Sequence, residues 1–155
     1  MSSSHVGYQS RAVELGRPLE SPKVLPSRGR SAQGTRVMTS QRPRRILIVD
    51  DDANAREALR ELLEARGYIV VALGDGADAL EHLRTSARPN LIVLDLLMPG
   101  MDGWDFRHRQ REDPALAGIP VIALSGAGKL IDVDVCLRKP VDIGELLLTI
   151  ERTIA

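Results

Sequence analysis

Short apolar runs alternate with amphipathic segments from residue 44 to residue 155. The first run, Ile46–Val49, has the β-branched composition of a strand buried on both faces of a parallel sheet. Further short runs follow at residues 68–72, 91–94, 121–124 and 135–137. Strands that alternate with helical segments indicate right-handed βαβ crossovers. The pattern therefore predicts an α/β fold, a doubly wound five-stranded parallel sheet with helices on both faces.

The segments between these runs carry helical periodicity. The first has apolar residues at i, i+3, i+4, i+7 and i+8 and closes at Gly67; these residues are Ala55, Ala58, Leu59, Leu62 and Leu63. A second helix is predicted from Ala77 to about residue 87, and a last one after an Asp142 cap. The segment at residues 104–113 has only two apolar residues before a basic run. It predicts a weaker helix that buries little and is loosely held.

Residues 1–43 differ in composition from the rest of the chain. They contain four prolines and eight serines, and no apolar periodicity persists. They also hold seven Lys/Arg against two Glu, whereas residues 44–155 hold fourteen against nineteen acidic residues. We expect a disordered basic tail over 1–43 and an acidic folded domain over 44–155.

Composition excludes several classes of protein. The single cysteine, Cys136, excludes an intramolecular disulfide and favours a reducing compartment. No apolar run approaches the roughly 18 residues that a membrane span needs, so a cytoplasmic protein without a membrane partner is expected. The basic run at residues 42–45 is short, lacks aromatic neighbours and leads into an acidic domain, so no nucleic-acid partner is expected.

Carboxylates follow two of the predicted strands. Asp50, Asp51 and Asp52 come directly after the first strand, and Asp95 follows the third. In open α/β sheets the ligand site lies beyond the carboxyl ends of the strands, so these side chains should share one crevice. Crowded carboxylates are costly unless a cation compensates them, and Mg²⁺ prefers such oxygen ligands. The sequence therefore predicts a magnesium site.

Two further polar residues belong to the same end of the sheet. Ser125 follows the fourth strand, and Lys139 follows the fifth. A hydroxyl and an ammonium beside a metal-bound carboxylate can hold a phosphoryl group. An aspartate can itself accept that group as an acyl phosphate, and Asp95, alone on its strand, is the best candidate.

These residues resemble the response-regulator receiver domains. The matching motifs are Ile46-Leu-Ile-Val-Asp50-Asp51 with Arg56 beyond it, Leu91-Ile-Val-Leu-Asp95 continuing to Met98-Pro99-Gly-Met-Asp-Gly103, Pro120-Val-Ile-Ala-Leu-Ser125, and Arg138-Lys139-Pro140. The resemblance covers residues 44–155 and implies the flavodoxin-like strand order 2-1-3-4-5.

The resemblance implies a role for each site residue. Asp95 would be the phosphoacceptor, and Asp50, Asp51, Asp95 and the backbone carbonyl of Leu97 would hold Mg²⁺. Ser125 would be the switch hydroxyl, and Lys139 would pair with the phosphoryl group. Lys139-Pro140 would be a cis peptide. The implied function is that of a stand-alone phosphorelay protein, a phosphoacceptor that at most catalyses its own phosphorylation and dephosphorylation.

The implied partners are a sensor histidine kinase or a histidine phosphotransfer protein, together with an unknown downstream protein target. The phosphorelay would operate in the cytoplasm.

Three departures from the family pattern affect switching. Only thirteen residues separate Ser125 from Lys139, so the fourth helix should be short or missing. Cys136 stands where the family often has a switch aromatic, and it is predicted to be a small buried residue. Leu97 and Ala127, which flank the phosphoryl site, offer no group to orient an attacking water, so an acyl phosphate should decay slowly.

Two other functions remain open at this point. One is a phosphorylation-independent pseudo-receiver that acts as a docking module. The other is a haloacid-dehalogenase-type phosphatase that uses Asp50 and Asp52, in which the later acidic pair Asp132 and Asp134 would serve the metal. The receiver and phosphatase mechanisms differ in which aspartate becomes phosphorylated.

Overall fold

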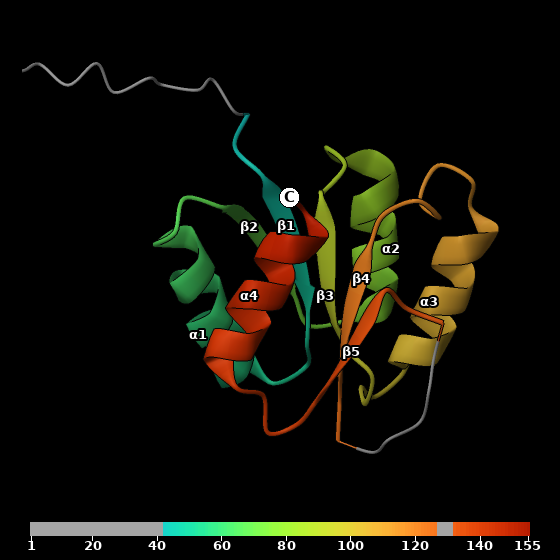
Figure 1. Ribbon diagram of the computed structural model, residues 1–155. Helices are drawn as coiled ribbons and strands as arrows, with labels where there is room; N and C mark the ends of the chain where they lie inside the picture. Colours follow the sequence, from blue (N-terminus) through green and yellow to red (C-terminus); the bar gives the residue numbers. More distant parts are fainter. Residues whose placement is uncertain (1–41, 127–131) are drawn as a thin grey trace, which may run out of the picture. The chain divides into compact units, whose positions relative to one another are not determined.

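A computed structural model describes residues 42–126 and 132–155 and shows a five-stranded parallel sheet (Figure 1). The strands are β1 (Arg45–Val49), β2 (Ile69–Leu73), β3 (Leu91–Asp95), β4 (Val121–Ser125) and β5 (Val135–Arg138). They lie in the order β2-β1-β3-β4-β5, and every neighbouring pair is parallel. The predicted doubly wound sheet and its strand order are confirmed.

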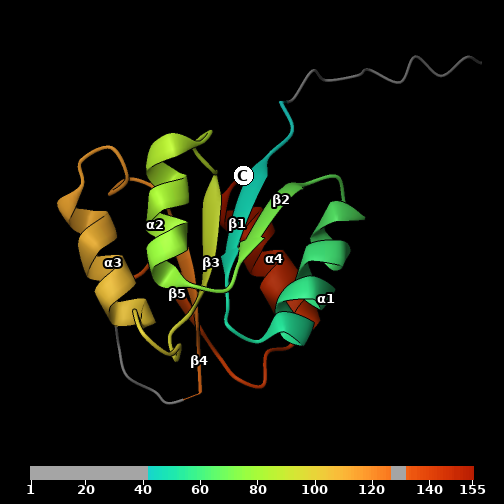
Figure 2. The same ribbon diagram turned by 180° about the vertical axis from the view of Figure 1, so that it is seen from behind.

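Helices cover both faces of the sheet, as predicted. Helices α1 (Ala53–Glu64) and α4 (Ile143–Thr153) lie on one face, and α2 (Gly76–Thr85) and α3 (Gly103–Glu112) lie on the other (Figures 1 and 2). The described part of the chain contains these four helices and none between β4 and β5. This agrees with the prediction that the helix there is short or missing, although residues 127–131 lie outside the described residues.

Two apolar cores, one on each side of the sheet, explain the continuous apolar runs of the strands. Successive side chains of a strand point to opposite faces. Leu47 and Val49 therefore join the core under α2 and α3, whereas Ile46 and Ile48 join the core under α1 and α4. Because both faces are covered, β1 needs apolar residues at consecutive positions.

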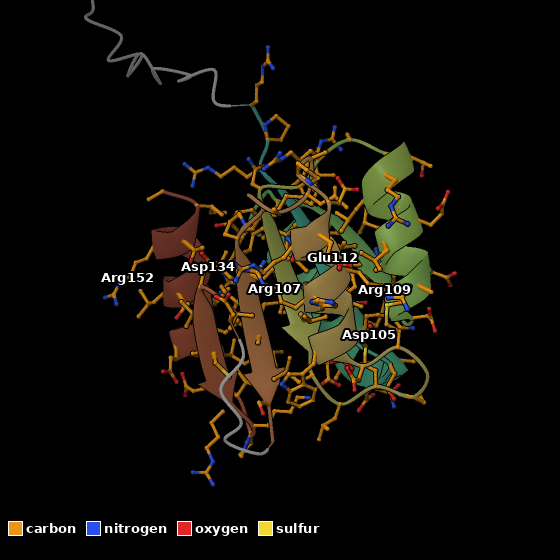
Figure 3. The ribbon with its side chains drawn as sticks, turned by 90° about the vertical axis from the view of Figure 1, so that its right-hand side faces the viewer. Asp105, Arg107, Arg109, Glu112, Asp134 and Arg152 are labelled. Atoms are coloured by element: carbon orange, nitrogen blue, oxygen red, sulfur yellow. The ribbon has the colours of Figure 1, made fainter. Side chains whose placement is uncertain are left out.

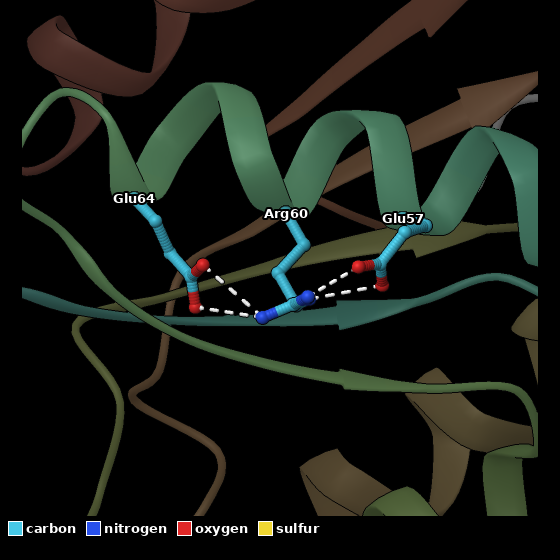
Figure 4. Close-up of polar contacts among 3 residues, drawn as sticks. All are labelled: Glu57, Arg60 and Glu64. Atoms are coloured by element: carbon cyan, nitrogen blue, oxygen red, sulfur yellow. Dashed lines mark hydrogen bonds and ion pairs between the residues drawn. The ribbon is translucent and has the colours of Figure 1, made fainter.

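Helix α1 has an exposed face that carries an ion-pair network. The Arg60 guanidinium bridges Glu57 and Glu64, which lie one turn away on either side (Figure 4). The hydrogen bond from Arg60 lowers the pKa of Glu57. Since all three side chains are open to solvent, we attribute little of the stability of the fold to this network. After α1, Gly67 has a φ of 86°, a left-handed conformation that favours glycine and ends the helix as predicted.

Helix α3 is the element that the sequence described least well. The prediction that it buries little is wrong, because Phe106 and Gln110 are fully buried and Arg107 is nearly so. The Gln110 side-chain amide donates to the main-chain oxygens of Leu116 and Ile119, at 3.0 Å each. Buried polar side chains that satisfy backbone carbonyls replace the missing apolar stripe.

Arg107 connects α3 to the segment that precedes β5. Its Nε donates to the main-chain oxygen of Asp132 at 2.6 Å, and a second nitrogen donates to Gln110 Oε1 at 2.8 Å. Burial lowers the pKa of the Arg107 guanidinium, and the carboxylate of nearby Asp134 opposes this shift (Figure 3). Arg111, one turn further along α3, forms an ion pair with Asp132. The helix is therefore tied to the sheet by polar contacts.

The prediction that Cys136 is buried is wrong. Cys136 is exposed, although the next residue, Leu137, is buried in the core under α1 and α4. Strand β5 lies at the edge of the sheet, and Cys136 points to the opposite face from Leu137. Within residues 42–126 and 132–155, no helix follows β4 to cover that face near β5, so the thiol stays open to solvent.

No helix in the described ranges is long and apolar enough to span a membrane. The predicted disordered tail at residues 1–43 lies almost entirely outside the described residues, and its boundary at residue 43 stays a prediction.

Candidate functional site

Three carboxylates meet at the carboxyl ends of β1 and β3. The two strands pair with Val49 opposite Leu94, so the residues that follow, Asp50 and Asp95, lie at the same edge of the sheet. Carboxylate oxygens of Asp50, Asp51 and Asp95 all lie within 4.8 Å of one another. Asp50 and Asp95 are only 6% and 3% exposed, whereas Asp51 is open to solvent. The chain thus concentrates negative charge in a partly buried pocket of the surface.

The electrostatics of Asp50 reflect this crowding. Burial raises the pKa of Asp50 above the usual aspartate value, and the Asp95 and Asp51 carboxylates act in the same direction. A hydrogen bond from the Asp52 N–H to Asp50 Oδ1, 2.8 Å long, and the Lys139 cation oppose the shift. A divalent cation would relieve the repulsion, and three hard oxygen donors suit Mg²⁺.

Lys139 places a positive charge against Asp95. Its Nζ lies 3.1 Å from Asp95 Oδ1, and the same oxygen accepts a 3.2 Å hydrogen bond from the Leu97 N–H. The Lys139 main-chain N–H donates to the Ser125 carbonyl oxygen at 2.8 Å, which fixes the start of the loop after β5. The Lys139-Pro140 peptide is cis, as the family resemblance implied.

Ser125 lies at the end of β4, beside the end of β3. The Leu96 N–H donates to the Leu124 carbonyl at 3.1 Å, so the two strand ends are held together. Ser125 itself is 3% exposed. The Leu97 side chain, two residues after Asp95, is 58% exposed. Ala127, the second predicted flanking residue, lies outside the described residues.

The loop after β3 folds back tightly on the site. The Gly103 N–H donates to the Leu96 carbonyl at 3.0 Å. A Cβ on Gly103 would lie 2.6 Å from the Leu96 Cα, closer than any side chain tolerates, so only glycine permits this approach. Gly100 in the same loop has a φ of 75°. The close approach at position 103 and the positive φ at position 100 explain why glycine occupies both positions in the motif that follows Asp95.

The other aspartates have structural roles. Asp52 caps α1 by accepting from the Asn54 and Ala55 N–H groups, and Asp102 caps α3 by accepting from the Asp105 N–H.

The phosphatase alternative is not favoured by this geometry. Asp134 accepts a hydrogen bond from the Val121 N–H at 2.8 Å and therefore lies at the amino end of β4, whereas Asp50 lies at the carboxyl edge of the sheet. Asp132 is paired with Arg111. The late acidic pair that a phosphatase of this type would need is not beside Asp50.

Two features of the site were not found by sequence reasoning. The first is the contact of Arg56 with the main chain of Asp50, at 2.6 Å, which requires knowledge of how α1 turns back on β1. The second is a groove of about 560 Å³ between α1 and α4. Its apolar lining includes Ala58, Leu62 and Ile143, and Asp50 and Lys139 close the end next to the site. The apolar periodicity of the two helices was the only signal for it.

Fold and site together define a class of protein. It is a doubly wound domain with a carboxylate cluster that could hold a metal ion and a lysine paired with one of these carboxylates, at the edge of the sheet where the strand order reverses. The chain matches the response regulator receiver domain family over residues 46–151, and it belongs to that family. It is a receiver domain of two-component response regulators, a family of phosphoacceptors that are not enzymes in general and that bind Mg²⁺. The pseudo-receiver alternative is not favoured, because the acidic cluster and lysine are assembled.

Relatives and solved structures agree with this assignment. The chain is 39% identical over 98 residues to the DNA-binding response regulator MtrA of Mycolicibacterium paratuberculosis, a match that covers 63% of this chain and 42% of the relative. The chain thus spans less than half the length of that relative. A putative response regulator from Chloroflexus aurantiacus is 28% identical with a TM-score of 0.67, and the match covers 72% of this chain and 98% of that one.

A chemotaxis response regulator, CheY4 of Vibrio cholerae, is 27% identical with a TM-score of 0.66, again over 72% of this chain and 98% of that chain.

Proposed function

We propose that Asp95 accepts a phosphoryl group in a phosphorelay. The observation that carries this proposal is the convergence of two kinds of charge on one buried carboxylate. Lys139 Nζ lies 3.1 Å from Asp95 Oδ1, and the oxygens of Asp50 and Asp51 lie within 4.8 Å of the Asp95 carboxylate. An ammonium and a cation-binding acidic pair are what the three oxygens of a phosphoryl group require.

We assign the metal ligands from the same geometry. Asp50, Asp51 and Asp95 offer carboxylate oxygens, and the main-chain carbonyl of Leu97 is the fourth protein ligand that the family pattern implies. Bound Mg²⁺ would neutralise charge on the oxygens of the phosphoryl group. The three carboxylates fit this ion because all are hard donors and two are buried.

The transfer step is a displacement at phosphorus. A carboxylate oxygen of Asp95 forms the new O–P bond, and the bond to the donor breaks with its electron pair leaving on the donor nitrogen or oxygen. The Lys139 ammonium pairs with a phosphoryl oxygen, while the Ser125 hydroxyl donates to another. In this proposal the chain is a phosphoacceptor that at most catalyses its own phosphorylation and dephosphorylation.

The partner that supplies the group would be a sensor histidine kinase or a histidine phosphotransfer protein in the cytoplasm. We propose that a helix of this partner binds in the groove between α1 and α4, since Asp50 and Lys139 line both the groove and the site. A bulky charge there, as in Ala58→Arg, should slow transfer from any histidine kinase that phosphorylates the wild-type chain. Labelling by acetyl phosphate should be unchanged. Phosphorylation would then alter the surface offered to a downstream protein.

The proposal is tested by incubating the chain with Mg²⁺ and acetyl phosphate and mapping the adduct by mass spectrometry. We expect one phosphoryl group on Asp95 in the wild type and none in Asp95→Asn, which is nearly isosteric and keeps the fold. Circular dichroism of the variant is the control for folding. Undiminished labelling of Asp95→Asn, or an adduct on Asp50 or Asp52, would overturn the assignment.

A further inference from the structure

A guanidinium lies between the two loops that follow β1 and β2. Arg56, in the first turns of α1, donates from a terminal nitrogen to the main-chain oxygen of Asp50 at 2.6 Å. On its other side is Gly74, the residue after β2. A Cβ on Gly74 would lie 3.0 Å from that nitrogen and 3.4 Å from Arg56 Cζ. A side chain at position 74 would therefore crowd the Arg56 guanidinium.

The main chain of Asp50 is held from several directions. Its N–H donates to the Leu73 carbonyl at 3.1 Å, its carbonyl accepts from Arg56, and its carboxylate accepts from the Asp52 N–H. Arg56 is anchored in turn, because its own N–H donates to the Asp52 carbonyl at 2.9 Å as α1 begins. The start of the helix and the end of β1 thus form one connected unit.

Fixing the Asp50 carbonyl also fixes the residue that follows. The carbonyl lies in the plane of the Asp50–Asp51 peptide, so a bond to its oxygen restrains the orientation of that plane and of both flanking side chains. Without such restraint, repulsion among three carboxylates within 4.8 Å would turn the acidic pair apart. A charged donor makes the restraint stronger than a neutral hydrogen bond would.

We infer that Arg56 is a positioning residue that holds Asp50 and Asp51 in the arrangement a divalent cation needs. The inference rests on the proposed function of the acidic cluster. Arg56 acts through its hydrogen bond to the backbone, because the charged neighbours that shift the pKa of Asp50 are Asp95, Lys139 and Asp51. Loss of an outer-shell partner of this kind lowers metal affinity by about tenfold to a hundredfold.

The test compares Arg56→Met with Arg66→Met. Arg66 lies just beyond the other end of α1 and makes the same type of bond, from a guanidinium nitrogen to the Leu62 carbonyl at 3.0 Å. It is at the opposite end of α1 from Asp50 and Asp51 and therefore serves as the matched control. Mg²⁺ affinity is measured by isothermal titration calorimetry, and labelling by acetyl phosphate is measured against Mg²⁺ concentration. Arg56→Met should raise the Kd for Mg²⁺ about tenfold, while its labelling rate at saturating Mg²⁺ stays close to the wild-type rate. Arg66→Met should change neither.

A second variant guards against a folding defect. Gly74→Ala keeps Arg56 and adds a methyl group against its guanidinium, so it should raise the Kd for Mg²⁺ by a smaller factor. Wild-type Mg²⁺ affinity in both Arg56→Met and Gly74→Ala would overturn the inference and leave the proposed function intact. A wild-type chain that neither binds Mg²⁺ nor becomes labelled would overturn the proposed function itself.

Discussion

Replacing Asp50 by asparagine should stabilise the metal-free protein and abolish its response to Mg²⁺. The amide oxygen can still accept from the Asp52 N–H, so the local geometry is retained while the charge is lost. At the 4.8 Å limit that spans the three carboxylates, one like-charge pair costs about 1 to 3 kcal/mol for effective dielectric constants between about 80 and 20. Lys139 compensates part of this cost, so we expect a net gain of about 1–2 kcal/mol.

Thermal unfolding followed by circular dichroism measures this effect. In EDTA at neutral pH, Asp50→Asn should melt about 4–8 °C above the wild type, given the size of the domain. Millimolar Mg²⁺ should raise the melting temperature of the wild type alone. Because the pKa of Asp50 is raised in the folded state, the wild type loses stability as pH rises through that pKa. The advantage of the variant should therefore shrink as pH falls below it. A variant that melts below the wild type in EDTA, or an advantage independent of pH, would refute the reasoning.

Three further outcomes are expected. Asp51→Ala removes an exposed ligand, so the fold should persist while the rise in melting temperature with Mg²⁺ is smaller; an unchanged rise would contradict its role. Leu97→Asn adds a polar group at the exposed position two residues after Asp95, so acyl phosphate should decay faster than in the wild type, measured by mass over time; an equal rate would show that Leu97 does not set the lifetime. Gln110→Leu removes the donor to the Ile119 carbonyl and the acceptor for one terminal nitrogen of Arg107, which should lower the free energy of unfolding in urea by about 2–4 kcal/mol; a loss under about 0.5 kcal/mol would contradict this.

The sheet and the acidic cluster were predictable because both depend on local rules. Apolar runs predict buried parallel strands, and all parallel strands end at the same edge, so Asp50 and Asp95 were expected at one edge of the sheet. The adjacency of β1 and β3 then makes them neighbours. Every predicted strand and helix lies within two residues of its observed position. The pairing of Lys139 with Asp95 followed the same rule, since it comes from the edge at which β5 ends.

The failures concern contacts that no local pattern encodes. Gln110 is buried because carbonyls several residues later need a donor, and a polar residue in a helix gives no sign of that. Cys136 was assigned to the interior from its chemistry, but its exposure depends on what covers an edge strand. The link from Arg56 to the Asp50 carbonyl depends on the side-chain path, which spacing alone does not specify.

The polar interior of α3 has a consequence for the order in which the chain folds. A helix with an apolar stripe can join a collapsing core as soon as it is made, but α3 has little of that driving force. Its buried donors find their acceptors later in the chain, at Leu116, Ile119 and, 25 residues beyond Arg107, at Asp132. Until those carbonyls are in place, desolvating Arg107 and Gln110 is unfavourable. Docking of α3 should thus be a late event, one that waits for the chain to reach β5.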